Sequence, residues 1–205
     1  MNNVAQKSKT KIICGTIVAF AAWFSIIFQF YLAKESFINV LSYFTILCNL
    51  LIASSLTFSL FLPKTRIGIY CSSVSTQTAI ALYIFIVALV YNTVLRGIWT
   101  VKGWQLLIDN MLHVVIPILY LSYWFLFTAK DKLNWKNGIY WLVFPALYLI
   151  YSLVRGSILK WYPYPFLNVD KHGYDKVVVN IGIMLLLFII AGAILIAINN
   201  KIVKK

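Results

Sequence analysis

The chain alternates long apolar runs with short polar connections. A transmembrane helix needs roughly 20 predominantly apolar residues, and several runs meet or approach this length. These runs cover residues 12–32, 38–62, 72–95, 106–128, 138–154 and 176–199. The longest connection, residues 155–175, is too short for a soluble domain. We therefore predict an all-α, polytopic integral membrane protein whose residues 1–205 form a single domain of six transmembrane helices.

The first apolar run follows Lys7, Lys9 and Lys11, an arrangement that is also found in secretory signal peptides. The run 12–32 contains about 20 uncharged residues, whereas the apolar region of a signal peptide has about 7–15. No cleavage motif of small residues follows it. We interpret this run as a retained first transmembrane helix.

The distribution of basic residues predicts the orientation in the membrane. With the N-terminus inside, 11 of the 18 Lys and Arg residues face the cytoplasm and 7 face outward. The inner set is Lys7, Lys9, Lys11, Lys64, Arg66, Lys130, Lys132, Lys136, Lys201, Lys204 and Lys205. The outer set is Lys34, Arg96, Lys102, Arg155, Lys160, Lys171 and Lys176. The excess of Lys and Arg on the inner side predicts that both termini are cytoplasmic. We expect the protein to be integral to the cell (plasma) membrane.

Composition narrows the class of protein further. Hydrophobic residues make up 62% of the chain and charged residues 11%, whereas soluble domains carry about a quarter charged residues. The net charge of +13 does not indicate nucleic-acid binding, because the basic residues lie in short connections and not along one helix face. We interpret Cys14, Cys48 and Cys71 as buried, unpaired thiols. The two histidines lack metal-ligand spacing, and we expect no metal and no other cofactor.

The second apolar run, LSYFTILCNLLIAS, carries a polar stripe. Ser42, Thr45 and Asn49 are spaced three and four residues apart, so a helix places them on one face. Thr45 and His113 each lie about 7 residues from the outer end of their runs, roughly 10 Å deep at ~1.5 Å per residue. The predicted topology therefore places a hydroxyl and an imidazole at the same level of the membrane.

Polar residues of the other runs also gather in the outer half of the membrane. The full set is Ser42, Thr45, Asn49, Asn92, Arg96, Asp109, Asn110, His113, Arg155 and Asn180. Ionisable residues inside a membrane are costly and indicate function by default. The inner halves of the runs carry no charge and no histidine.

Acyl transfer is one chemistry that this cluster predicts. A threonine hydroxyl becomes a useful nucleophile when a nearby base takes its proton. His113 would be the base, and Asp109, one helical turn earlier, would orient the imidazole ring. We assign Asn110, the residue after Asp109, to the same orienting group. Pro117 has no N–H, so we expect a kink and a carbonyl of His113 without its helical donor.

The remaining outer residues are candidates for the polar end of a pocket. A developing oxyanion needs hydrogen-bond donors, and a substrate carboxylate pairs well with arginine. The candidates for these substrate-binding or oxyanion roles are Asn49, Asn92, Arg96, Arg155 and Asn180.

Two other interpretations of the same residues stay open. Thr, Ser, Asn and His commonly join transmembrane helices by hydrogen bonds worth about 0.6–2 kcal/mol, which is a purely structural role. The cluster is also compatible with a binding protein or transporter for a small solute or for protons. The outer connection WYPYPF, whose two prolines exclude a helix, is interpreted as an interfacial aromatic belt or as a lid over a lateral opening.

Four motifs resemble one family of membrane proteins. LSYFTILCNL, NTVLRGIW, DNMLHVVIPILYLSYW and VRGSILKWYPYPFLNVDKHGY together resemble the bacterial six-span Pr-six-Pr family, across the second to sixth runs. That family is distantly similar to the androgen-induced and androgen-dependent transmembrane threonine hydrolases, which act on fatty acid esters of hydroxy fatty acids (FAHFAs). The resemblance implies that Thr45 is the nucleophile and His113 the base. The first histidine of that family's histidine pair is Asn110 here, and its Trp-Lys lead is replaced near Val40 and Leu41.

These observations together predict a hydrolase of lipid metabolism. Its partners would be a lipid-ester substrate and the lipids of the bilayer, with no nucleic acid. The oligomeric state is left open.

The predicted base makes the activity depend on pH. Hydrolysis is expected to fall as the pH is lowered from about 8 to about 5, because a protonated His113 cannot accept the proton of Thr45. The rate is measured in detergent with one matched ester across this range. A flat profile contradicts the role of the histidine.

Overall fold

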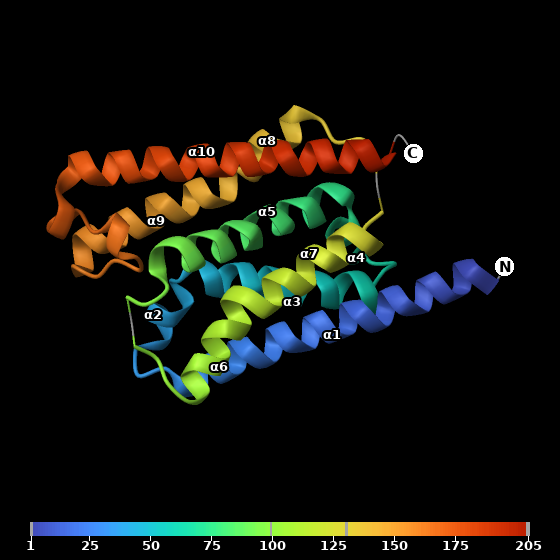
Figure 1. Ribbon diagram of the computed structural model, residues 1–205, viewed down its shortest axis with the longest axis horizontal. Helices are drawn as coiled ribbons and strands as arrows, with labels where there is room; N and C mark the ends of the chain where they lie inside the picture. Colours follow the sequence, from blue (N-terminus) through green and yellow to red (C-terminus); the bar gives the residue numbers. More distant parts are fainter. Residues whose placement is uncertain (1, 99, 130, 204–205) are drawn as a thin grey trace.

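The computed structural model describes residues 2–98, 100–129 and 131–203, and it describes side chains from residue 9 onward. Within this part of the chain every regular element is helical (Figure 1). Six of the helices are long and apolar enough to cross a membrane. The predicted all-α class with six transmembrane helices is therefore confirmed, and the chain is a multi-pass membrane protein.

The helical elements follow one another with short connections. In chain order they are α1 (Asn2–Leu32), α2 (Phe37–Leu41), α3 (Phe44–Phe61), α4 (Arg66–Ser72), α5 (Val74–Val90), η1 (Tyr91–Leu95), α6 (Trp104–Asn110), η2 (Met111–Val115), α7 (Ile116–Phe127), α8 (Trp135–Trp141), α9 (Val143–Leu159), η3 (Pro165–Leu167) and α10 (Val169–Val203). The elements η1 and η2 are π-helical, and η3 is a short 3-10 helix. The third span is therefore α5 with η1, the fourth is α6–η2–α7, and the fifth is α8 with α9.

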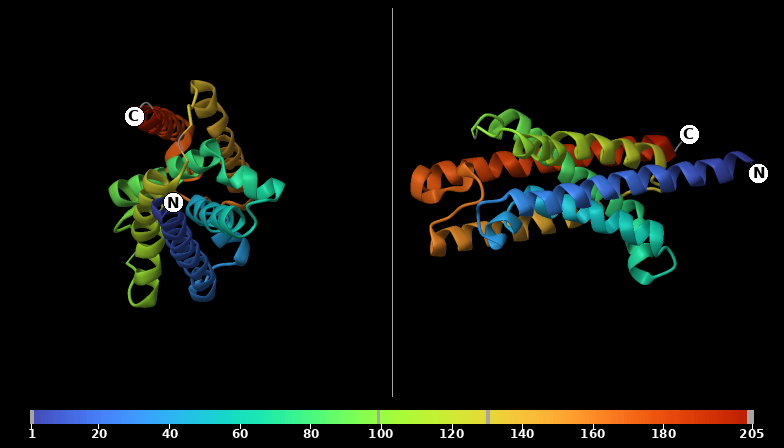
Figure 2. Two further views of the ribbon diagram at one scale, coloured as in Figure 1. Left: turned by 90° about the vertical axis from the view of Figure 1, so that its right-hand side faces the viewer. Right: turned by 90° about the horizontal axis from the view of Figure 1, so that it is seen from below.

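Helix α5 is the centre of the bundle. It packs against α3, α7 and α10, and most of its side chains are buried. Helices α1 and α3 lie side by side on one flank, and α9 and α10 lie on the other (Figures 1 and 2). The two marked chain ends lie at the same end of the bundle (Figure 1), as an even number of spans requires.

The second apolar run is broken near its N-terminal end. Helix α2 ends at Leu41, and Tyr43 has an extended backbone (φ −78°, ψ 129°) from which α3 begins. The hydroxyl of Ser42 donates to the carbonyl of Ile38 at 2.6 Å, and its carbonyl accepts from the hydroxyl of Tyr148 at 2.9 Å. The break places Thr45 in the first turn of α3, and not about two turns inside a continuous helix.

The other span limits differ from the apolar runs by a few residues. The apolar helices are Lys9–Leu32, Phe44–Phe61, Val74–Leu95, Trp104–Phe127, Trp135–Leu159 and Val169–Val203. The last two extend well beyond the predicted runs 138–154 and 176–199, because helical backbone continues into the polar residues at each end. Inside the last helix, Gly173 leaves helical geometry (φ 77°, ψ 162°), which bends the chain where it reaches the apolar part.

A proline in the fifth span shows how the bundle keeps its main chain hydrogen-bonded. Pro145 has no N–H for the carbonyl of Trp141, four residues earlier. The buried hydroxyl of Tyr83 on α5 donates to this carbonyl at 2.7 Å. Lipid offers no hydrogen bonds, so such carbonyls need donors from the protein. This bond ties the fifth span to the central helix.

Two smaller expectations concern the thiols and the orientation. All three cysteines are free; Cys48 and Cys71 are buried as expected, whereas Cys14 is only half-buried. Of the basic residues that predict the orientation, Lys130, Lys204 and Lys205 lie outside the described residues.

A tight helix contact gives a stability prediction. A Cβ at Gly68 would overlap the carbonyl of Leu62 and approach the carbonyl oxygen of Phe58 to 2.9 Å. We expect Gly68→Ala to lower the free energy of unfolding by about 1–3 kcal/mol, measured as a lower thermal midpoint in detergent. Gly182→Ala is the matched control, because a Cβ there meets no atom within 4 Å. Equal midpoints for the two variants would contradict this account of the α3–α4 contact.

Candidate active site

Thr45 lies at the N-terminal end of α3. It is only 6% exposed. The first N–H groups of a helix have no partner within the helix, so the main-chain N–H of Thr45 is free to bind elsewhere. It donates to the hydroxyl of Tyr164 at 3.3 Å. The side chain of Thr45 therefore stands beside a main-chain donor.

His113 reaches the threonine from the fourth span. Its Nε2 lies 3.2 Å from Oγ1 of Thr45. Its Nδ1 lies 2.8 Å from the main-chain carbonyl of Asp109 and 3.2 Å from the carboxylate of the same residue. Both partners of Nδ1 accept hydrogen bonds, so in the neutral ring the proton is on Nδ1 and Nε2 is the acceptor. The hydroxyl of Thr45 consequently donates to His113.

Tyr91 holds the imidazole and the carboxylate in place. Its ring stacks on that of His113, with centroids 3.9 Å apart and planes inclined by 14°. Its hydroxyl donates to the carboxylate of Asp109. The ring of His113 is thus held on one face and at one nitrogen. The sequence offered no specific signal for Tyr91, since tyrosine is frequent in this chain.

A π-helical turn next to Pro117 brings the second and fourth spans together. The N–H of Ile116 donates to the carbonyl of Met111, five residues back. In this register the next donor would be Pro117, so the carbonyl of Leu112 has no helical partner. Asn49 on α3 donates to it at 3.2 Å, and the same amide nitrogen donates to the carbonyl of Thr45 at 2.8 Å.

The carbonyl of His113, for which the sequence predicted the missing donor, lies near Asn92 of the third span. The amide nitrogen of Asn92 lies 3.5 Å from this carbonyl and 2.8 Å from that of Ala88. The two asparagines predicted as oxyanion or pocket residues, Asn49 and Asn92, therefore point their amide groups at main-chain carbonyls.

Arg96 and Asn110 form a separate pair near the C-terminal end of the third span. The guanidinium of Arg96 donates to the side-chain oxygen of Asn110 at 2.8 Å and lies 5.8 Å from the ring centre of Tyr91. Within the described part of the chain, neither side chain hydrogen-bonds to Thr45.

Arg155 and Asn180 lie on the other side of the site and hold the connection between α9 and α10. Arg155 donates to the side-chain oxygen of Asn39 at 2.6 Å, and its guanidinium lies 4.4 Å from the ring centre of Trp161. Asn180 donates to the carbonyl of Phe166 at 2.9 Å. Both residues therefore fix the WYPYPF connection, and their hydrogen bonds do not reach Thr45.

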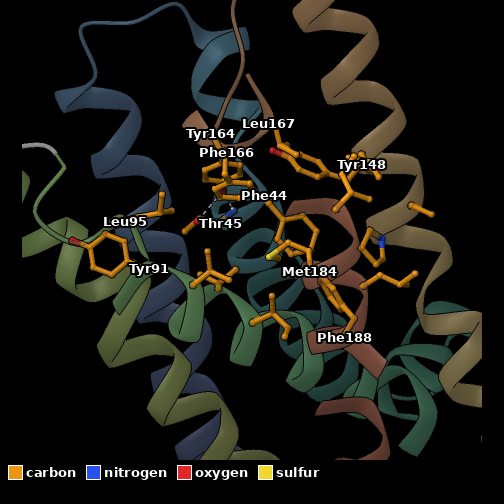
Figure 3. Close-up of a pocket in the computed structure, with 18 of the residues that line it drawn as sticks. Phe44, Thr45, Tyr91, Leu95, Tyr148, Tyr164, Phe166, Leu167, Met184 and Phe188 are labelled. Carbon is orange, nitrogen blue, oxygen red and sulfur yellow. Dashed lines mark hydrogen bonds between the residues drawn. The ribbon is translucent and has the colours of Figure 1, made fainter. Parts of the chain in front are cut away.

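This connection supplies a site residue that the sequence did not predict. Tyr164 folds into the bundle, is 8% exposed, and places its hydroxyl 3.3 Å from Oγ1 of Thr45 (Figure 3). The ring of Tyr162 packs where a side chain at Gly156 would otherwise lie, which holds the connection against α9. Burial raises the pKa of the Tyr164 hydroxyl to about 12, against the opposing effect of its hydrogen bonds with Thr45. The prolines were expected to exclude a helix here, but the short 3-10 helix η3 begins at Pro165. Nothing in the sequence indicated the depth of Tyr164.

An apolar cavity of about 290 Å³ opens on one side of Thr45. It lies between α3, α5, α9 and α10, with Phe44, Met184 and Phe188 around it (Figure 3). Leu185 lines this cavity and is 49% exposed on the membrane-spanning part of α10. The cavity therefore reaches the lipid-facing surface beside α10.

A larger, more polar cavity of about 730 Å³ opens on the other side of Thr45. Asp109 and His113 line it, together with the charged residues Lys34, Glu35 and Lys102 of the connections that precede α2 and α6. Both cavities are lined by Thr45, Tyr91, Leu95 and Tyr164. The hydroxyl of Thr45 thus stands where an apolar space meets a polar one.

Comparisons of the chain with known protein families, with curated proteins and with solved structures find no match. The described residues contain no group of three or more His, Cys, Asp and Glu side chains arranged to hold a metal ion.

Proposed function

We propose that this protein hydrolyses a lipid ester within the outer half of the membrane, with Thr45 as nucleophile and His113 as general base. The observation that carries the proposal is the 3.2 Å separation of Oγ1 and Nε2, with Nδ1 held by Asp109. A nucleophile, a base and a group that orients the base are the minimum arrangement for acyl transfer.

The reaction would proceed in two balanced steps. In the first, Oγ1 of Thr45 bonds to the ester carbon while its proton passes to Nε2 of His113. The tetrahedral intermediate then expels the alcohol, which takes that proton and leaves an acyl-threonine. In the second, His113 takes a proton from water as the oxygen attacks the acyl carbon, and returns it to Oγ1 as the acid leaves. Asp109 stabilises the imidazolium in both steps.

The two cavities suggest how the substrate is divided. The acyl chain would enter from the lipid beside α10 and occupy the apolar cavity. The alcohol part, and later the attacking water, would occupy the polar cavity. Lys34 and Lys102 at that cavity suit an alcohol part that carries a carboxylate. This agrees with the family resemblance, which implies fatty acid esters of hydroxy fatty acids as substrates.

Both chain ends are proposed to be cytoplasmic, in the cell membrane. The excess of basic residues in the connections at that end supports this orientation. It places Thr45 and both cavities in the leaflet that faces away from the cytoplasm.

Covalent labelling tests the nucleophile. We expect an alkyl fluorophosphonate to modify the wild-type protein at Thr45, because Oγ1 displaces fluoride while His113 accepts its proton. Thr45→Ala and His113→Ala should lose labelling and ester hydrolysis by at least about 10²-fold, measured by peptide mass spectrometry and by release of 4-nitrophenol from an octanoate ester.

Thr57→Ala is the matched control. This threonine lies on the same helix and binds the main chain of Ala53 and the indole of Trp23. Equal labelling of the wild type and Thr45→Ala would contradict the proposal that Thr45 is the nucleophile. Lower thermal stability without lost activity favours the structural interpretation, and solute uptake without labelling favours a transporter.

The apolar cavity predicts a limit on acyl length. Val87 is buried on α5 and lines this cavity, so Val87→Phe should shorten the space available. We expect kcat/KM for a 4-nitrophenyl palmitate to fall about 10-fold or more relative to the butyrate. Val178→Phe makes the same change at a position 63% exposed on α10 and should leave the ratio unchanged. An unaltered ratio in Val87→Phe would place the acyl chain elsewhere.

A further inference from the structure

The hydroxyl of Thr45 has two hydrogen-bond partners but only one proton. Because Nδ1 of His113 carries the proton of the neutral ring, the threonine hydroxyl donates to Nε2. The contact with Tyr164 must therefore run the other way, with the phenol donating to Oγ1 at 3.3 Å. The phenol oxygen also accepts from the main-chain N–H of Thr45 at 3.3 Å. Two donors, one phenolic and one main-chain, thus converge beside the proposed nucleophile.

We propose that the Tyr164 hydroxyl and the main-chain N–H of Thr45 form the oxyanion hole of the reaction. The inference rests on the proposed hydrolase function and adds a catalytic residue to it. When Oγ1 bonds to the ester carbon, the carbonyl oxygen becomes an oxyanion on the same tetrahedral carbon. It then lies next to both donors. The phenol turns its O–H from Oγ1 to this oxygen, and the N–H of Thr45, whose direction is fixed by the helix, donates to the same oxygen in place of the phenol.

The geometry of the resting site suits this exchange. Both contacts of the phenol are 3.3 Å long, beyond the usual distance for strong hydrogen bonds. Catalytic hydrogen bonds are often long before substrate binds and tighten in the transition state. The N–H of Thr45 also belongs to the first turn of α3, where the helix dipole favours negative charge.

The environment of Tyr164 keeps it a donor. Burial raises the pKa of its hydroxyl to about 12, so the phenol retains its proton throughout the range in which a histidine base works. Its ring stacks on Phe166 at 5.3 Å and meets Tyr43 edge-on at 5.8 Å. These contacts hold the ring in position and leave the O–H free to rotate.

Four of the other five candidates for this role, among them Asn180, which donates to the carbonyl of Phe166, donate to groups elsewhere. The amide groups of Asn49 and Asn92 donate to main-chain carbonyls. The guanidinium of Arg96 binds Asn110. In the described chain, Tyr164 is the side chain besides His113 that has a recorded hydrogen bond with Oγ1 of Thr45.

The test compares the full-length wild type with Tyr164→Phe in detergent, using 4-nitrophenyl octanoate as substrate. Removing one oxyanion-hole donor typically lowers kcat by about 10²–10³-fold. We expect that loss with KM changed by less than about threefold. Tyr120→Phe is the control, because it removes another buried hydroxyl, which is bonded to the carbonyl of Gln77. Its kcat should stay near that of the wild type.

A second readout separates catalysis from packing. Octylboronic acid bonds to a nucleophilic hydroxyl and mimics the tetrahedral intermediate, whereas octanoate resembles the ground state. Tyr164→Phe should weaken inhibition by octylboronic acid by about the factor lost in kcat, and leave inhibition by octanoate unchanged. A purely structural tyrosine would weaken both equally or neither.

The outcomes distinguish the inference from the function on which it rests. Hydrolysis that depends on Thr45 but is retained by Tyr164→Phe overturns the oxyanion hole alone. Equal loss of boronate and octanoate binding in Tyr164→Phe also overturns it. A wild type without Thr45-dependent hydrolysis overturns the proposed function, and the inference with it.

Discussion

A main-chain carbonyl surrounded by lipid-facing helices needs a donor from the protein itself, and the site depends on how this need is met around Pro117. The proline removes a donor from a π-helical turn, and the carbonyl of Leu112 is left free. Asn49 fills the gap from α3, and its amide also binds the carbonyl of Thr45. The same hydrogen-bonded group therefore joins the span of the threonine to the span of the histidine. The carbonyl that lacks an N–H partner in the fourth span is thus used for a contact with α3 next to the site.

Beyond this contact, each polar group of the site decides whether the next group donates or accepts a hydrogen bond. The main-chain carbonyl and carboxylate of Asp109 leave one tautomer open to His113. That tautomer makes Thr45 a donor, and a donating threonine makes Tyr164 a donor to it. Tyr91 covers the imidazole ring and binds the same carboxylate. Because the interior is of low polarity, each of these bonds is costly to leave unmade. The donor and the acceptor in each hydrogen bond near Thr45 therefore follow from these successive contacts.

The position of Thr45 between two unlike cavities suits the proposed hydrolysis of a lipid ester. An ester of a lipid has an apolar acyl part and a more polar alcohol part, and hydrolysis needs water at the bond between them. The apolar cavity lies between α3, α5, α9 and α10, and the polar cavity lies between α1, α3 and the fourth span. Helix α3 contributes to both because its N-terminal end lies between them. The same separation would keep water out of the lipid-facing cavity.

The sequence by itself determined the class of the protein, and it predicts a similar depth for Thr45 and His113. Six long apolar runs leave few alternatives to six membrane-spanning helices, because apolar length is a local property of the chain. The structure brings the side chains of Thr45 and His113 within 3.2 Å of each other. Only the tertiary structure decided which helices and side chains are in contact. Counting residues does not reveal that α3 begins at Phe44, that Asn49 and Asn92 are used by carbonyls, or that Arg155 and Asn180 hold a connection. Nor does it place Tyr164, whose depth depends on how the chain between α9 and α10 folds over helices far away in sequence. Depth follows from position along one helix, whereas hydrogen-bond direction follows from which helices meet.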